Sequence, residues 1–265
     1  YTIETLMPDG KALQSGTSHY FGQGFAKAFD MKFLDKDNKL KHVHQTSWGV
    51  STRLLGAIIM VHGDDNGLVL PPRFAPIQVR IIPIRQNENT VIEKVYEVRE
   101  QLQKRGIRVD IDDSDKSPGY KFSEAEMRGI PVRIEIGPKD IENNTCVAVK
   151  RNDNEKIKIK MDKNLPEIVE GLLSIMHNEM YEKALDYLQR HTTRVNNYDD
   201  FKDKLENVGG FVEAPWCGNM DCEVKIKDTT TATTRCITEE NPTEKDKCIC
   251  CGEDARYIVK FAKSY

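Results

Sequence analysis

Seven cysteines, five of them in two close groups near the C-terminus, are the residues of this 265-residue sequence best suited to chemistry. Cys217 and Cys222 are separated by four residues, Cys248 and Cys251 by two, and a stretch of 25 residues joins the pairs. Two close thiol pairs joined by a longer segment are typical of tetrahedral Zn²⁺ sites, and four thiolates leave no open coordination position. The spacing therefore predicts a structural zinc site, with Cys250 as an alternative ligand.

The other interpretation of these cysteines is a cluster of free, half-buried thiols. A glycine directly follows the first and the last of the four predicted ligands, and glycine allows the tight turns that present thiolates to one ion. The glycine after Cys251 favours this residue over Cys250 as the fourth ligand. We interpret the remaining Cys146 and Cys236 as small apolar residues.

A second candidate site surrounds Arg53, which stands at the head of the apolar run 54–61. The apolar residues of this run recur at helical spacing, so Arg53 is expected at a helix N-terminus. A guanidinium there can pair with a phosphate or lie flat on a purine ring. An arginine that extends along the surface is the alternative interpretation.

The residues before Arg53 add to this site. Ser51 and Thr52 supply hydroxyl groups, Trp48 an apolar wall, and Gly49 a place where a ligand approaches the backbone. Three polar side chains lie upstream beside glycines, namely Gln14, Thr17 and His19. A lone histidine is more often structural than functional, so the local pattern around His19 carries little weight by itself.

The elements that position these residues fall into three blocks. In residues 1–75 we expect a strand over 42–48, a helix over 51–63 and a short buried strand over 67–72 that ends at two prolines. In residues 76–187 strands and amphipathic helices alternate. The expected strands there are 75–84, 106–112, 130–137, 145–151 and 156–161, and the expected helices are 89–105 and one within 117–129.

The alternating pattern predicts an α/β domain with a mixed sheet. A long helix with Pro166 in its first turn follows, and its apolar stripe from Val169 to Leu188 is expected to be a packing face. A weaker helix is expected around 198–207. We assign residues 188–265, which include the cysteines, to a third and smaller domain.

The overall composition excludes several classes of protein. Lys plus Arg is 39 and Asp plus Glu is 42, so the formal charge is −3 and any RNA contact must be local. No run of about 18 apolar residues is present, so no membrane span is expected. The N-terminal residues lack a basic head followed by an apolar stretch, so we expect no signal peptide there, and the cysteine usage leads us to expect a cytoplasmic protein with reduced thiols.

Four separated stretches resemble the C-terminal half of a prolyl-tRNA synthetase of the archaeal and eukaryotic type. They are MPDGKALQSGTSHYFGQGFAKAF, QTSWGVSTRLLGAIIMVHGDDNGLVLPPRFAPIQV, SPGYKFSEAEMRGIPVRIEIGPKD and the final KFAKSY. The resemblance implies a multidomain α+β and α/β protein. Its expected parts are the C-terminal portion of a class II antiparallel catalytic sheet (1–75), an α/β anticodon-binding domain (76–187) and a small α+β zinc-binding domain (188–265).

The resemblance also implies roles for individual residues. The STR of residues 51–53 is similar to class II motif 3, whose arginine contacts ATP. The implied ATP-binding residues are Gln14, Thr17, Ser51, Thr52 and Arg53, with Arg53 as the catalytic one. The implied proline-binding residues are His19, Trp48 and Gly49.

Three further residues are implied near the anticodon, namely Phe122, Glu126 and Lys139. In the alternative interpretation Phe122 belongs to the core and Glu126 is a solvated helix residue. The terminal carboxylate of Tyr265 is implied to fold back toward the active site.

The implied activity is the ATP-dependent attachment of proline to tRNA(Pro) through prolyl-adenylate, with Mg²⁺ and with a homodimer as the intact enzyme. Class II motifs 1 and 2 are not found in this sequence, so we expect it to begin inside the catalytic domain and to be inactive alone. A non-catalytic tRNA-binding module derived from a synthetase is the alternative. A class II synthetase for threonine, histidine or glycine is a third possibility, against which the cysteine groups and the final SY argue.

Overall fold

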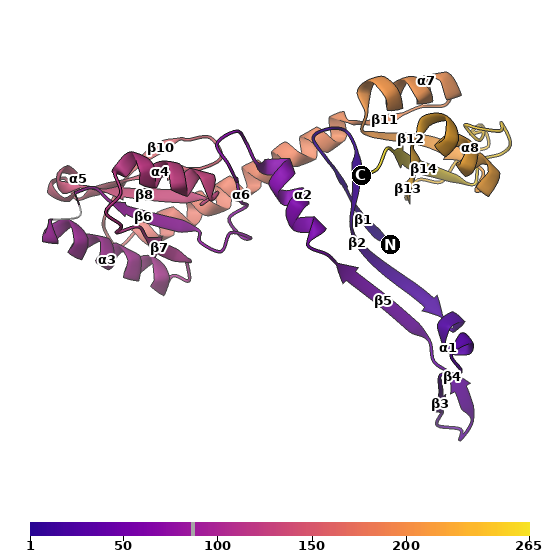
Figure 1. The fold of residues 1–265 in the computed structure, drawn as a ribbon, viewed down its shortest axis with the longest axis horizontal. Helices are drawn as coiled ribbons and strands as arrows, with labels where there is room; N and C mark the ends of the chain where they lie inside the picture. Colours follow the sequence, from indigo (N-terminus) through magenta and orange to yellow (C-terminus); the bar gives the residue numbers. More distant parts are fainter. Residues whose placement is uncertain (86–87) are drawn as a thin grey trace. The chain divides into compact units, whose positions relative to one another are not determined.

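The computed structural model describes residues 1–85 and 88–265, and they form two compact units. Unit 1 comprises residues 1–57 and 187–265, and unit 2 comprises residues 58–186. The labels of Figure 1 are used from here on. Helices α2 (Arg53–His62) and α6 (Leu165–Arg190) each contribute residues to both units.

The N-terminal part of unit 1 is a three-stranded antiparallel sheet in the order β1-β2-β5. Its strands are β1 (Thr2–Leu6), β2 (Ala12–Gly22) and β5 (Gln45–Val50), and α1 (Gly24–Ala28) and the hairpin of β3 (Lys32–Leu34) and β4 (Leu40–His42) lie between β2 and β5 in the chain. The single strand predicted over 42–48 is wrong. The segment divides because β4 pairs with β3 whereas β5 pairs with β2.

The C-terminal part of unit 1 is a four-stranded sheet in the order β11-β12-β14-β13. Its elements are β11 (Thr192–Arg194), α7 (Tyr198–Asp203), the π-helical turn η1 (Lys204–Val208), β12 (Phe211–Trp216), α8 (Met220–Thr230), β13 (Thr233–Ile237) and β14 (Tyr257–Ala262). Phe201, Ile226 and Phe261 are buried at the centre of its core. A buried ion pair from Glu4 to Arg235, 2.6 Å, joins the two parts of unit 1.

Unit 2 contains the predicted mixed sheet, in the order β10-β9-β8-β6-β7. Its elements are β6 (Val79–Pro83), α3 (Asn89–Lys104), β7 (Val109–Ile111), α4 (Pro118–Met127), β8 (Val132–Ile136), α5 (Pro138–Glu142), β9 (Thr145–Lys150) and β10 (Lys156–Lys160). Strand β6 is parallel to β7 and β8, and the pairs β8–β9 and β9–β10 are antiparallel. The short α5 was not expected from the sequence.

The two faces of this sheet differ because side chains alternate along each strand. Val79, Ile81, Val132 and Ile134 enter one core with the apolar stripe of α3 and the first three turns of α6. The intervening Ile82 packs with Ala125 of α4 instead. Two buried arginines, Arg80 and Arg133, occupy the same alternate positions. The α4 side of the sheet therefore has both a small apolar cluster and two buried arginines.

The strand predicted over 67–72 is also wrong. Its backbone N–H groups bond to residues at and just after the end of α4: Leu68 N donates to Met127 O (3.1 Å) and Leu70 N to Gly129 O (3.4 Å). Pro71 and Pro72 have no N–H to offer a neighbouring strand.

In the described part of the chain, no helix has the length and apolar character needed to cross a bilayer.

Candidate functional site

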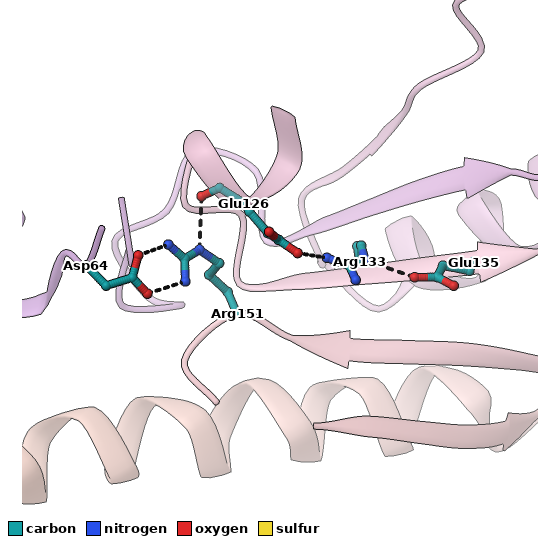
Figure 2. Close-up of polar contacts among 5 residues, drawn as sticks. All are labelled: Asp64, Glu126, Arg133, Glu135 and Arg151. Carbon is teal, nitrogen blue, oxygen red and sulfur yellow. Dashed lines mark hydrogen bonds and ion pairs between the residues drawn. The ribbon is translucent and has the colours of Figure 1, made fainter. Parts of the chain in front are cut away.

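Four side chains on the α4 side of the unit 2 sheet form one polar group, which we name the α4-face cluster: Phe122, Glu126, Arg133 and Glu135. Figure 2 shows three of them, with Arg133 between two carboxylates. Arg133 Nη1 donates to Glu126 Oε1 (2.5 Å), and its Nε donates to Glu135 Oε1 (2.9 Å). The guanidinium carbon lies 4.7 Å from the centre of the Phe122 ring. The cluster thus holds an aromatic face, a cation and two acids in fixed positions.

Local sequence explains how these residues meet. Ser117 caps α4 by accepting from Tyr120 N, and Pro118 occupies the first turn. Phe122 and Glu126 are four residues apart, so they lie on one side of the helix. Arg133 and Glu135 are two residues apart on β8 and share one face of the sheet. Phe122 and Glu126 of α4 therefore lie over Arg133 and Glu135 of β8.

Two of the three predicted anticodon residues belong to this cluster. The Phe122 ring packs beside Ile82 and Ala125, as its alternative interpretation expects, yet it also carries Arg133 on its face. Glu126 is not a solvated helix residue, because its side chain is only 27% exposed and ion-paired. Lys139 is exposed on α5, and no hydrogen bond or ion pair of the described residues joins it to the cluster.

Arg133 and Glu135 were missed by the sequence analysis. The available signal was the alternation in VRIEI, where charged residues take the strand positions opposite the apolar ones. Aromatic faces, guanidinium groups and carboxylates are the groups with which proteins stack on and hydrogen-bond unpaired bases. The cluster therefore has the chemistry of a base-recognition site.

A buried arginine, Arg151, binds the backbone of the cluster residue Glu126. Arg151 donates through both terminal nitrogens to Asp64 (2.7 and 2.6 Å) and through Nε to the backbone oxygen of Glu126 (2.9 Å), as Figure 2 shows. The Arg151 side chain is 2% exposed. The hydrogen bonds from Arg151 hold the pKa of Asp64 down at about 2. The end of α4 is thus tied to the segment that follows α2.

The four predicted zinc ligands lie together in unit 1. The sulfur atoms of Cys217, Cys222, Cys248 and Cys251 are all within 4.8 Å of one another. Cys217 Sγ is 3.7 Å from Cys222 Sγ and 3.8 Å from Cys251 Sγ. Zn–S bonds of about 2.3 Å in a tetrahedron separate the sulfurs by about 3.8 Å. The donor set and its spacing therefore fit Zn²⁺.

The turns around these thiols explain which cysteines take part. Cys217 follows β12, Cys222 lies in the first turn of α8, and Gly252 N bonds to Cys248 O (2.9 Å) to close the second turn. Cys250 packs against the hydrophobic core of the unit instead of joining the sulfur group.

The thiols of this group have different acidities. Burial raises the pKa of the Cys222 thiol. Burial would also raise the pKa of Cys248, but backbone N–H groups of Cys251, Cys250 and Cys217 lower it to about 7. A thiol with a pKa near neutrality loses its proton readily, and the thiolate that remains is the form that binds a metal.

The predicted nucleotide residues lie on β2, in the two residues between β5 and α2, and at the first residue of α2. Arg53 Nη1 donates to the backbone oxygen of Gln14 (3.4 Å), and Arg53 N donates to Ser51 Oγ (3.3 Å). Thr17 pairs with Gly49 across the sheet. The backbone oxygen of Thr52 accepts from Leu55 N at the start of the helix. All these contacts are exposed or partly exposed, and Arg53 reaches β2 from the helix end.

The predicted proline residues are not brought together. His19 pairs with Ser47 and Trp48 pairs with Ser18, so the two rings project from opposite faces of the sheet. Trp48 is 80% exposed, and His19 stacks on Phe21 with 5.4 Å between ring centres. Gly49 lies on the face of His19. The register of β2 and β5 separates the two rings, and the role of Trp48 and His19 toward proline stays a prediction.

The C-terminal residue lies beside the start of β2. Tyr265 N donates to Ala12 O (3.3 Å), and its hydroxyl donates to Asp9 Oδ2 (2.8 Å). Lys11 Nζ lies 5.0 Å from the centre of the Tyr265 ring. Ala12 is two residues before Gln14, so the chain end is held close in sequence to the predicted nucleotide residues.

Comparison with known proteins gives two family matches. Residues 78–171 match the family model described as "Anticodon binding domain", and residues 198–265 match "Prolyl-tRNA synthetase, C-terminal". The first match contains the α4-face cluster and the second contains the sulfur group.

Similar curated proteins cover the whole chain. The chain is 55% identical over 265 residues to the "Proline--tRNA ligase" of Lachnospira eligens, and 55% identical over 265 residues to that of Lachnoclostridium phytofermentans. It is 53% identical over 264 residues to that of Oceanobacillus iheyensis. All of the chain is covered in each case, but only 55% of each relative, so the chain spans about half the length of the curated relatives it matches.

Proposed function

We propose that this chain belongs to the prolyl-tRNA synthetase family, binds tRNA(Pro) and forms the anticodon-reading and C-terminal part of an enzyme that attaches proline to that tRNA. The observation that carries the proposal is the α4-face cluster, which lies inside the segment matching an anticodon-binding domain. That the enzyme is of the archaeal and eukaryotic type stays a prediction, because the names of the relatives do not state a type.

The α4-face cluster is proposed to read the anticodon. The Phe122 ring offers a stacking surface, and the Glu126 carboxylate accepts from base amino or imino groups. Arg133 either donates to a base edge or holds Glu126 in place. Lys139, exposed on α5, is proposed to contact the RNA backbone from outside the cluster. Because the charges are already paired and half-buried, little ordering is needed when a base arrives.

The residues around Arg53 are proposed to bind ATP and proline in the complete enzyme. The proline carboxylate attacks the α-phosphate, a new P–O bond forms, and pyrophosphate leaves with the electron pair of the broken bond. A terminal hydroxyl of the tRNA then attacks the prolyl carbonyl, and AMP leaves. Arg53 would neutralise charge on the phosphates, with Mg²⁺ supplying further positive charge when bound.

The other nucleotide and proline residues are proposed to position the reactants. Gln14 and Thr17 lie on β2 near the Arg53 contact, and Ser51 and Thr52 lie at the start of α2. His19 and Gly49 share the sheet face proposed for proline, whereas Trp48 would serve from the other face. The Tyr265 carboxylate is proposed to lie toward this site.

The sulfur group is proposed to hold a structural Zn²⁺ through the thiolates of Cys217, Cys222, Cys248 and Cys251. Four sulfur ligands would close the coordination sphere, so the ion stabilises the fold and takes no part in the reaction. As part of the same proposal, the complete enzyme works in the cytoplasm as a homodimer.

Binding of tRNA(Pro) to the 265-residue chain tests the first part of the proposal. We expect Glu126→Gln and Phe122→Ala to weaken binding by about 1–3 kcal/mol each, the scale of one base contact. Lys158→Ala, on the exposed edge strand β10, is the matched control and should leave binding within twofold. Equal binding of tRNAs with altered anticodons would refute anticodon reading.

A non-catalytic tRNA-binding module is the second candidate, because residues 78–171 match an anticodon-binding domain. Proline-dependent exchange of pyrophosphate into ATP separates the two. We expect no exchange by the 265-residue chain alone and exchange when the same residues stand in a chain of the relatives' full length. Exchange by the short chain would contradict the first expectation, and none by the long chain would favour the module.

A further inference from the structure

Unit 2 contains a hollow outside the α4-face cluster, with a cavity volume of about 190 Å³. Three elements form it: the loop of residues 72–78 before β6, the end of α3 with Gly106 and Ile107, and the face of α6 from Glu170 to His177. A water molecule occupies about 30 Å³ in the liquid, so the hollow has room for a small polyatomic ion.

Two arginines and one glutamate supply the charged groups of the lining. Arg73 comes from the loop and Arg105 from the end of α3. Arg105 Nε is bound to Glu170 Oε2 at 2.8 Å, and Glu167 lies one turn earlier on α6. Within residues 1–85 and 88–265, no carboxylate lies within ion-pair distance of Arg73. The charge of Arg73 is therefore open to an anion from outside the chain.

Hydrogen bonds hold in place the loop of residues 72–78 that carries Arg73. The guanidinium of Arg108 donates to the backbone oxygens of Pro72 (3.1 Å), Arg73 (3.3 Å) and Ala75 (2.8 Å). Gln78 Nε2 also donates to Pro72 O (3.1 Å), and its Oε1 accepts from Arg108 N (3.0 Å). These acceptors are neutral, so Arg108 fixes the loop and adds a second positive charge without a carboxylate partner.

The α6 wall offers a histidine nitrogen without a partner. Nδ1 of His177 is buried and makes no hydrogen bond in the described part of the chain. Burial, and then the nearby charge of Arg73, lower the pKa of His177. His62 also lies close enough to interact with His177 electrostatically. Nδ1 itself is closed to solvent, so only the rest of the His177 side chain can meet an anion in the hollow.

We propose that this hollow binds a phosphate group, held by Arg73 and Arg105 with His177 and Ser174 as further donors. Donors arrive from three elements, and a tetrahedral phosphate presents oxygens in several directions, whereas a carboxylate presents two in one plane. The phosphate is either free inorganic phosphate or a phosphodiester of RNA. Only the RNA source rests on the proposed function.

Inorganic phosphate and the 265-residue chain labelled at histidine test the proposal by nuclear magnetic resonance. We expect a saturable shift of the His177 ring signals, with a dissociation constant in the millimolar range, against a chloride control of equal ionic strength. Arg73→Ala should weaken phosphate binding about tenfold or more, the loss of one charged hydrogen bond. Lys158→Ala removes a positive charge elsewhere on unit 2 and should change nothing.

No saturable shift of His177, or an equal shift in wild type and Arg73→Ala, would overturn the proposal. Arg73→Lys keeps the charge and should retain part of the binding, which separates charge from any change in folding. Competition between phosphate and tRNA(Pro) then identifies the source. Competition in wild type that is lost in Arg73→Ala indicates an RNA phosphodiester, and a shift without competition indicates free phosphate. If tRNA does not bind at all, the proposed function fails while the His177 result still decides this inference.

Discussion

Unit 2 has a large core within residues 79–173 and pairs its buried charges with acids or backbone oxygens, whereas unit 1 leaves much of its N-terminal sheet uncovered. In unit 1, Trp48 is 80% exposed, Phe29 73% and Leu40 68%. The C-terminal part of the same unit adds four clustered thiols to a smaller core.

This difference separates two kinds of site. The α4-face cluster is assembled by the chain itself, through ion pairs that are at most 27% exposed on each partner. The residues around Arg53 make exposed contacts, and the rings of Trp48 and His19 lie on opposite faces. A substitution in unit 2 should therefore affect both stability and recognition, but one near Arg53 should affect recognition alone.

The largest effect should come from disrupting the sulfur group. Cys222→Ser, or removal of metal by a chelator, should unfold the C-terminal part of unit 1 and leave unit 2 folded. Zinc binding in small domains contributes roughly 10–16 kcal/mol at neutral pH, so a loss of several kcal/mol is expected. Metal content of the purified chain and residue-resolved amide exchange measure it.

Cys236→Ser, on β13 outside the sulfur group, is the matched control and should keep one equivalent of zinc. Full protection of the C-terminal amides in metal-free Cys222→Ser would contradict the prediction. It would mean that both units are stabilised by their cores alone.

The next effect concerns the ion pair of unit 2 between the buried Arg151 and the partly exposed Asp64. Arg151→Met removes the ion-pair partner of Asp64 and one of the donors to the backbone oxygen of Glu126, so unit 2 should lose about 1–3 kcal/mol. Unfolding in urea, followed by amide signals of unit 2, measures the change.

The exposed pair Arg128–Glu124 provides the control for this substitution. Arg128→Met should cost at most about 1 kcal/mol, since exposed pairs on a helix contribute little. A similar small loss for Arg151→Met would show that the Arg151–Asp64 pair does not distinguish unit 2 from unit 1.

The sequence predicted the parts of unit 2 whose signals are local. The stripe Val91, Val95, Val98 and Leu102 is buried on α3 because helical spacing alone aligns it. The cysteine spacing likewise predicted the sulfur group. The strand over 67–72 failed because its partners, Met127 and Gly129, come from the end of a helix far along the chain.

Within the sites, the missing residues are those whose partners are distant. Arg151 and Asp64 are 87 positions apart, and nothing local marks either of them as buried. Arg133 meets Glu126 because a helix crosses a strand, which periodicity within either element cannot reveal. The opposite directions of Trp48 and His19 depend on the register between β2 and β5, which is fixed only in the folded sheet.

A smaller effect is expected from acid. The pKa of Asp64 is about 2 in the folded chain, below its ordinary value of 3.8, so its contribution is present above about pH 4 and is lost as the pH falls toward 2. Since its side chain is 42% exposed, solvent screening reduces this contribution to about 1 kcal/mol. The unfolding free energies of wild type and Asp64→Asn should converge between pH 4 and 2. A constant difference over this range would assign the effect of Asp64→Asn to something other than its charge.

The smallest effect on stability should come from the residues proposed for ATP and proline. Trp48→Ala and Arg53→Ala should each change the unfolding free energy of the chain by at most about 0.5 kcal/mol, the range of exposed substitutions. Phe261→Ala, an aromatic truncation at a fully buried position of the same unit, should cost about 3–5 kcal/mol. Thermal and urea unfolding of the three variants measure this contrast.

The contrast matters because the same two substitutions should abolish most proline-dependent exchange in a chain of the relatives' full length. If removing an exposed side chain leaves folding unchanged but greatly reduces turnover, that side chain contacts substrates or other chain segments. A loss above about 1 kcal/mol in Trp48→Ala would mean that the indole is packed in solution. The residues around Arg53 would then be assembled by the chain itself, as the α4-face cluster is, and the distinction between the two kinds of site would fail.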